Sequence, residues 1–142
     1  MIKKKGKRKM IGWIIVLIIL VGLAIPGGIG WSKLMKEHTE AKNLPLNAVD
    51  FNNLIDGVYV GEYAGGMYKW RANKVKVTVV SGKVVKIEPL EGVVDQKGDG
   101  STQMLYDRVI KSQSLQVDTI SGATLTSKGY LQAVENALVQ AQ

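Results

Sequence analysis

Residues 74–79 read Lys-Val-Lys-Val-Thr-Val, so that an apolar side chain falls at every second position. Alternation of this kind predicts a β-strand with its valines facing a core and its lysines facing water. Ser81-Gly82 then has the composition of a tight turn, and a second strand continues through Val85, Ile87 and Pro89. Because so short a turn joins neighbouring strands, the two strands pair antiparallel and form a β-hairpin.

The sequence around the hairpin predicts one further strand and two helices. Residues 58–63 have the composition of a strand. Ser101 or Thr102 can cap one helix, and another is expected from about Ser127. Apolar side chains recur at helical spacing in both: Leu105, Tyr106, Val109 and Ile110, then Leu131, Val134, Leu138 and Ala141. We therefore expect an α+β domain, in which a small antiparallel sheet packs with two helices.

Positive charge is concentrated at the start of the chain. Residues 1–9 contain six Lys or Arg residues and no acid, and the net charge of the chain is +7, which leaves +1 for the rest. A nearly neutral domain lacks the basic surface that binds nucleic acid, so we expect no such partner. The chain has no cysteine and one histidine, His38, so we also expect no disulfide, iron–sulfur cluster or metal site.

Residues 10–31 contain no charged side chain and are almost entirely apolar or glycine. A helix over 11–31 would be about 30 Å long, the thickness of the hydrocarbon core of a bilayer. Trp13 and Trp31 lie near its ends, where aromatic residues gather in membrane helices. We expect an uncleaved transmembrane helix here; the alternative is a cleaved signal peptide, which also has a basic tip and an apolar core.

This anchor defines the expected organisation of the chain. The basic tip, residues 1–9, would remain in the cytoplasm and place the C-terminal part outside it. Residues 32–53 are polar, with scattered charge, and are interpreted as a stalk or linker. The folded domain is expected at residues 54–142. The protein would then be a single-pass protein of the cell membrane with an extracytoplasmic domain.

A turn rich in small and hydroxyl-bearing residues, 118–127, precedes the last predicted helix. Such a turn suits a phosphate group, because the first N–H groups of a helix lack internal acceptors and the helix dipole there favours an anion. Gly122 and Ala123 allow close approach to the backbone, and the Thr124 hydroxyl could form a phosphoester. The residues alone leave a second interpretation open, in which Ser121, Thr124, Thr126 or Ser127 only caps the helix.

Asp118, Ser121, Gly122, Ala123 and Thr124 follow the spacing Asp-x-x-Ser-Gly-Ala-Thr. With the flanking residues 113–127 and 133–138, this spacing resembles the FMN-binding domain family, whose domain also occurs in the sodium-translocating NADH:quinone reductase and in the Rnf complex. In that family a flavin transferase, using FAD and magnesium, esterifies the last threonine of the signature to FMN. The resemblance, which extends upstream to about Leu54, implies covalent FMN on Thr124. It places Asp118, Ser121, Gly122, Ala123, Thr126 and Ser127 around the cofactor; for Asp118 the alternatives are recognition by the transferase and a role in shaping the turn alone.

The loop before the first predicted helix departs from the family pattern. Many small members have His-Gly-x-Gly at this place, where the chain has Lys97-Gly98-Asp99-Gly100. We expect Lys97 and Gly98 near a flavin carbonyl or phosphate, and a solvated loop is the alternative. Tyr63, Tyr68 and Trp70 would either stack on the flavin ring or pack against the sheet.

These observations favour an electron carrier over an enzyme that converts a substrate. The sequence presents no evident general acid, general base or substrate pocket, so no catalytic residue is assigned. FMN attached through its phosphate keeps its ring available for one or two electrons. We expect electrons to pass from a membrane donor to an extracytoplasmic acceptor. The alternatives are a reductase module acting on a small extracellular acceptor and a non-redox binding module tethered to the membrane.

Overall fold

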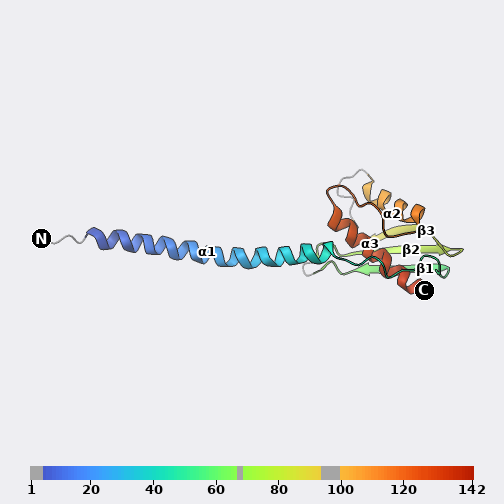
Figure 1. Ribbon diagram of the computed structural model, residues 1–142, viewed down its shortest axis with the longest axis horizontal. Coiled ribbons are helices and arrows are strands. Elements are labelled where there is room, and N and C mark those ends of the chain that lie inside the picture. The colour runs from blue at the N-terminus through green and yellow to red at the C-terminus, as the bar shows by residue number, and fades with distance from the viewer. Residues whose placement is uncertain (1–4, 67–68, 94–99) are drawn as a thin grey trace. The chain divides into compact units, whose positions relative to one another are not determined.

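The computed structural model describes residues 5–66, 69–93 and 100–142 (Figure 1). Its elements are helix α1 (Lys5–Lys42), strands β1 (Gly57–Tyr63), β2 (Asn73–Val80) and β3 (Lys83–Glu91), helices α2 (Ser101–Ser112) and α3 (Thr124–Leu138), and the 3-10 helix η1 (Val139–Ala141). The chain forms two compact units, Met1–Lys36 and Glu37–Gln142. The second unit contains the sheet, α2 and α3, and it has the predicted α+β architecture.

Helix α1 is continuous through residues 10–31, where the sequence predicts a membrane anchor. The side chains of residues 11–20 are all exposed. In the part of the chain that the structure describes, no helix is both long enough and apolar enough to cross a bilayer. The side chains of residues 21–30, which belong to the predicted span, lie outside that part. The structure thus confirms a helix here and does not identify a transmembrane span.

The sheet consists of three antiparallel strands in the order β1-β2-β3. The predicted hairpin is confirmed, since the three valines of residues 74–79 are at most 1% exposed. Ser81 and Gly82 have φ of 53° and 71°, and two consecutive positive values are typical of a type I′ turn. The Asp56 carboxylate accepts hydrogen bonds from the N–H groups of Gly82 and Ser81, which lowers the pKa of Asp56.

A β-bulge in β3 changes which of its residues face the core. Ile87 pairs with Val77, but the register then shifts and Val84 pairs with Val79, so that Val85 is left out of the ladder. Val84 is buried, whereas Val85 is 47% exposed. The strict alternation of β2 therefore does not continue through β3, because one extra residue moves the following side chains to the opposite face.

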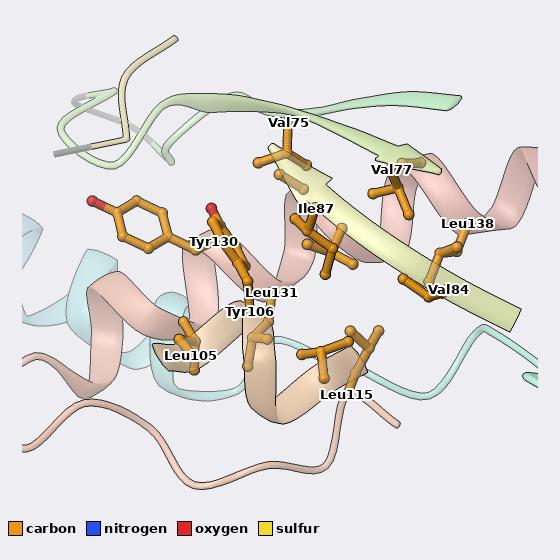
Figure 2. Packing of buried hydrophobic residues seen from close by; sticks show 14 of the residues in the cluster. Val75, Val77, Val84, Ile87, Leu105, Tyr106, Leu115, Tyr130, Leu131 and Leu138 are labelled. Carbon is orange, nitrogen blue, oxygen red and sulfur yellow. The ribbon is translucent and has the colours of Figure 1, made fainter. Parts of the chain in front are cut away.

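The buried faces of α2 and α3 form one core with the inner face of the sheet (Figure 2). Helix α3 packs against β1 and β2, and α2 packs against β3. At Gly61, α3 approaches so closely that a Cβ atom would overlap with backbone atoms of Ala133 and Ala137. The core includes Val75, Val77, Val79, Val84 and Ile87 from the sheet, Leu105, Tyr106 and Val109 from α2, and Leu131, Val134 and Leu138 from α3. The predicted apolar faces of both helices are thus confirmed at these positions.

Helix α2 begins without the predicted hydroxyl cap. Its N-cap is Gly100, whose φ of 77° is a left-handed conformation that glycine adopts without strain. Ser101 and Thr102 are already inside the helix, and both are buried. The prediction that one of them caps the helix is therefore wrong, because the glycine before them makes the turn into the helix.

The segment between α1 and β1 lies against the domain. The backbone N–H of Ala48 donates to the buried carboxylate of Glu135 at 2.7 Å. The side-chain amide of Gln116 donates to the carbonyl of Leu46 at 2.8 Å. The compact unit accordingly begins at Glu37, earlier than residue 54, where the sequence places the start of the domain.

Candidate functional site

The connection from α2 to α3 ends in a tight turn at residues 120–123. The N–H of Ala123 donates to the carbonyl of Ile120 at 2.9 Å and closes this turn. Gly122 has φ of 77°, as the third residue of a type II turn requires. Apart from its chain neighbours, no heavy atom of the described residues lies within 4 Å of the place that a Cβ of Gly122 would take. The surface over the turn is therefore open.

Helix α3 begins at Thr124, three residues before the predicted start at Ser127. Its N-cap is Ala123, with φ of −134° and no side-chain cap, so none of the four candidate hydroxyls takes that position. The first helical bond runs from the Ser127 N–H to the Ala123 carbonyl, at 2.9 Å. The N–H groups of residues 124–126 thus have no acceptor within the helix, and they give this end of α3 its capacity for an anion.

Ser127 holds the turn from below. Its side chain is fully buried, and its Oγ accepts a hydrogen bond from the Ile120 N–H at 3.1 Å. The same hydroxyl donates to the Ala123 carbonyl at 2.8 Å. Both ends of the turn are therefore fixed to the first turn of α3. Ser127 therefore binds the backbone of the predicted site from the buried side. The neighbouring Thr126 is half-buried.

Thr124 presents its side chain on the surface. Thr124 is exposed. Three other residues of the predicted site are also exposed, Ser121, Gly122 and Asp118, whereas Ala123 is half-buried. The Thr124 hydroxyl lies 3.5 Å from the hydroxyl of Thr119, at the outer limit of a hydrogen bond. This contact is too weak to fix the hydroxyl, and a second hydroxyl is not a general base. Thr124 is thus accessible and is not activated by its described neighbours.

Arg108 of α2 contacts the predicted site, although no motif in the sequence points to it. Its Nη1 donates to the carbonyl of Asp118 at 2.6 Å and lies 3.4 Å from the carbonyl of Thr119. The Asp118 side chain remains exposed beside it. A hollow of about 480 Å³ adjoins these contacts and is lined by Arg108, Lys111, Ser112, Gln116, Val117 and Asp118. The only signal in the sequence is a cation on the outer face of an amphipathic helix, which is too common to identify a role.

Of the other predicted site residues, the structure describes two and not the remaining three. Lys97, Gly98 and Tyr68 lie outside the described residues. Trp70 is 65% exposed. Tyr63 is half-buried and packs on α3, since a Cβ at Gly129 would lie 3.1 Å from its ring. For Tyr63 this contact favours the packing interpretation over stacking on a flavin.

Two further tyrosines lie in the core and not at the turn. Tyr106 and Tyr130 are both buried between α2, α3 and the sheet (Figure 2). Burial raises the pKa of the Tyr106 hydroxyl, and the nearby Tyr130 raises it further. A hydroxyl with a raised pKa stays neutral at physiological pH, so neither its charge nor its position suggests a catalytic role.

Comparison with known proteins identifies the segment that contains the turn. The family model described as the FMN-binding domain matches residues 69–139. The match includes β2, β3, α2, the whole of α3 and the whole turn with Thr124. No curated protein matches the chain.

Proposed function

The chain belongs to the FMN-binding domain family, and from this we propose that it is a flavoprotein that carries electrons on an FMN esterified to Thr124. The proposal rests on the position of Thr124. This residue is exposed, it is the first residue of α3, and the turn before it is tied to α3 by the hydrogen bond from the Ile120 N–H to the Ser127 hydroxyl. No other hydroxyl of the family signature combines this position with this exposure at the start of the helix.

The residues around Thr124 fit the phosphate end of FMN. The N–H groups of residues 124–126 are free of helical acceptors, and the dipole of α3 favours negative charge at this end. The open space over Gly122 admits a bulky group close to the backbone. Together these features stabilise a phosphodiester, which carries one negative charge, at the Thr124 oxygen.

Attachment would be a phosphoryl transfer from FAD. The Thr124 oxygen would form a bond to the phosphorus on the riboflavin side, and the bond from that phosphorus to the bridging oxygen would break. AMP would leave, and the hydroxyl proton would pass to a base. The described neighbours of Thr124 supply no such base, because its contact is the Thr119 hydroxyl. The base and the magnesium that neutralises the pyrophosphate would therefore come from a separate flavin transferase.

The attached FMN would supply one- and two-electron redox chemistry at its ring, which the phosphoester leaves unaltered. The chain itself would hold the cofactor and keep it in place. The described part of the site contains no carboxylate or histidine in contact with the Thr124 hydroxyl.

We also propose that residues 10–31 anchor this carrier in the cell membrane. The segment has no charged side chain, forms a continuous helix and follows a tip with six cations. By the positive-inside rule the tip would be cytoplasmic and the flavin domain extracytoplasmic. The electron donor would then be a membrane protein or a quinol, and the acceptor an extracytoplasmic protein. A protease added to cells that have an intact cytoplasmic membrane and no outer barrier to the protease should digest the domain; protection would contradict this topology.

The experiment that tests the attachment uses the whole chain, co-expressed with a flavin transferase and then denatured. Flavin fluorescence should remain with the wild-type band in a denaturing gel and should be lost in Thr124→Ala. Thr126→Ala removes the neighbouring hydroxyl and should keep the fluorescence. A colourless wild-type band, or fluorescence that survives in Thr124→Ala, would contradict the proposal.

A further inference from the structure

The connection between α2 and α3 has little secondary structure to hold it. Residues 116–120 form neither helix nor strand, so their backbone groups lack the regular partners that a sheet or helix provides. At its far end the connection is fixed by Ser127, which binds Ile120 and Ala123. Before Ile120, Gln116 is tied to the Leu46 carbonyl at 2.8 Å, which leaves Asp118 and Thr119 to be fixed by another group.

Arg108 supplies that fixation. Its guanidinium donates to the carbonyls of Asp118 and Thr119, at 2.6 and 3.4 Å, from a position ten residues earlier in the chain. The two acceptors are consecutive, and both contacts come from the same nitrogen, Nη1, so that one end of the guanidinium holds the pair of carbonyls. Arg108 thus links these two carbonyls to helix α2 through hydrogen bonds between described residues.

Thr119 connects the contact with Arg108 to the hydroxyl of Thr124. Thr119, whose carbonyl faces Arg108, has its own hydroxyl 3.5 Å from that of Thr124. A shift of the Thr119 backbone would therefore move the closest polar neighbour of the Thr124 oxygen. It would also move Asp118, the first residue of the family signature, whose side chain is exposed at this point.

We propose that Arg108 is a positioning residue for flavin attachment, which ties the carbonyls of Asp118 and Thr119 to α2 and so preorders the segment that the transferase must bind. This inference rests on the proposed function and adds a residue outside the turn to it. Without Arg108 the segment samples several conformations, and the transferase binds only the fraction that is correctly ordered. The apparent affinity falls by that fraction, while the chemistry of the bound complex is unchanged.

The chain offers a matched control for the charge of Arg108. Lys111 lies one helical turn further along α2 and lines the same hollow. It is exposed and makes no hydrogen bond to the turn in the described structure. Lys111→Gln therefore removes one positive charge from the hollow and leaves the hydrogen bonds to Asp118 and Thr119 in place. Arg108→Gln removes both the charge and these hydrogen bonds, and Arg108→Lys keeps the charge without the planar guanidinium.

The test measures flavin attachment to the full chain, in detergent, by a purified flavin transferase with FAD and magnesium, as the chain concentration is varied. Arg108→Gln should raise KM about twofold to tenfold, as expected for losing a solvent-exposed hydrogen bond, with little change in kcat. Arg108→Lys should give an intermediate KM, and Lys111→Gln should resemble the wild type. Equal KM values for Arg108→Gln and the wild type, or an equal rise in Lys111→Gln, would overturn the proposal.

A second readout does not depend on flavin. Amide hydrogen exchange at residues 116–121 should be faster in Arg108→Gln than in the wild type or in Lys111→Gln, while exchange in β2 should be unchanged. Unaltered exchange at 116–121 would contradict the positioning role. A wild-type chain that takes no flavin overturns the proposed function; a labelled wild type with an equally good Arg108→Gln substrate overturns this inference alone.

Discussion

Ser127→Ala is expected to loosen the turn that carries Thr124, and the structure sets the size of the effect. The substitution removes the acceptor of the Ile120 N–H, 3.1 Å away, and the donor to the Ala123 carbonyl, 2.8 Å away. The Ala123 carbonyl keeps its bond from the Ser127 N–H. The Ile120 N–H loses its partner, and water cannot easily replace it because Ser127 is fully buried.

A buried donor left without a partner costs about 1–3 kcal/mol. We therefore expect the free energy of unfolding of Ser127→Ala to be lower than that of the wild type by this amount. The amide of Ile120 should also lose its protection from hydrogen exchange. Urea unfolding followed by circular dichroism measures the first quantity, and exchange detected by mass spectrometry or NMR measures the second.

Thr126→Ala is the control for this experiment. Thr126 precedes Ser127 and is half-buried, and its side-chain hydroxyl makes no hydrogen bond in the part of the chain that the structure describes. Its replacement should be neutral or slightly stabilising, because alanine has the higher helix propensity. If Ser127→Ala unfolds at the same urea concentration as the wild type and Ile120 stays protected, then the buried hydroxyl does not hold the turn and the reasoning fails.

Two further predictions concern the sheet. Gly61→Ala should lower the free energy of unfolding by about 1–3 kcal/mol, because the Cβ of the new alanine would overlap with backbone atoms of Ala133 and Ala137. Urea unfolding measures this, and an unchanged midpoint would contradict the close packing of α3 on β1. Asp56 stabilises the hairpin turn only while ionised, because its lowered pKa favours the fold above pH 3.8 and this contribution is lost as pH falls through the folded-state value. Asp56→Ala should therefore be less stable than the wild type at pH 7 and equal to it well below pH 3.8, and a deficit that does not depend on pH would contradict this.

The hairpin could be predicted from the sequence because its determinants are local. The valines of residues 74–79 alternate with polar residues, and Ser81-Gly82 permits the positive φ angles of the turn. The bulge in β3 could not be predicted, since Val84 and Val85 are chemically identical neighbours. Only the packing of the core determines that Val84 is buried and Val85 exposed.

The candidate site was predictable in part for the same reason. Its signature is continuous in sequence, so family resemblance could point to FMN and to Thr124; the family match shows the FMN-binding domain, and the attachment to Thr124 stays a prediction. The start of α3 could not be placed from the sequence because several hydroxyl residues nearby are competent caps, while the structure uses Ala123. Arg108 could not be identified because it acts across space on carbonyls of another segment, and side-chain bonds to backbone carbonyls leave no pattern in the sequence.

The central claim is that Thr124 carries FMN through a phosphoester. Intact mass spectrometry of the full chain, produced with and without a flavin transferase, followed by mapping of the peptide that contains residues 118–128, tests this most directly. The account predicts a mass increase equal to FMN minus one water, present only with the transferase and located on Thr124. An unmodified chain in both preparations, or flavin on any other residue, would contradict it.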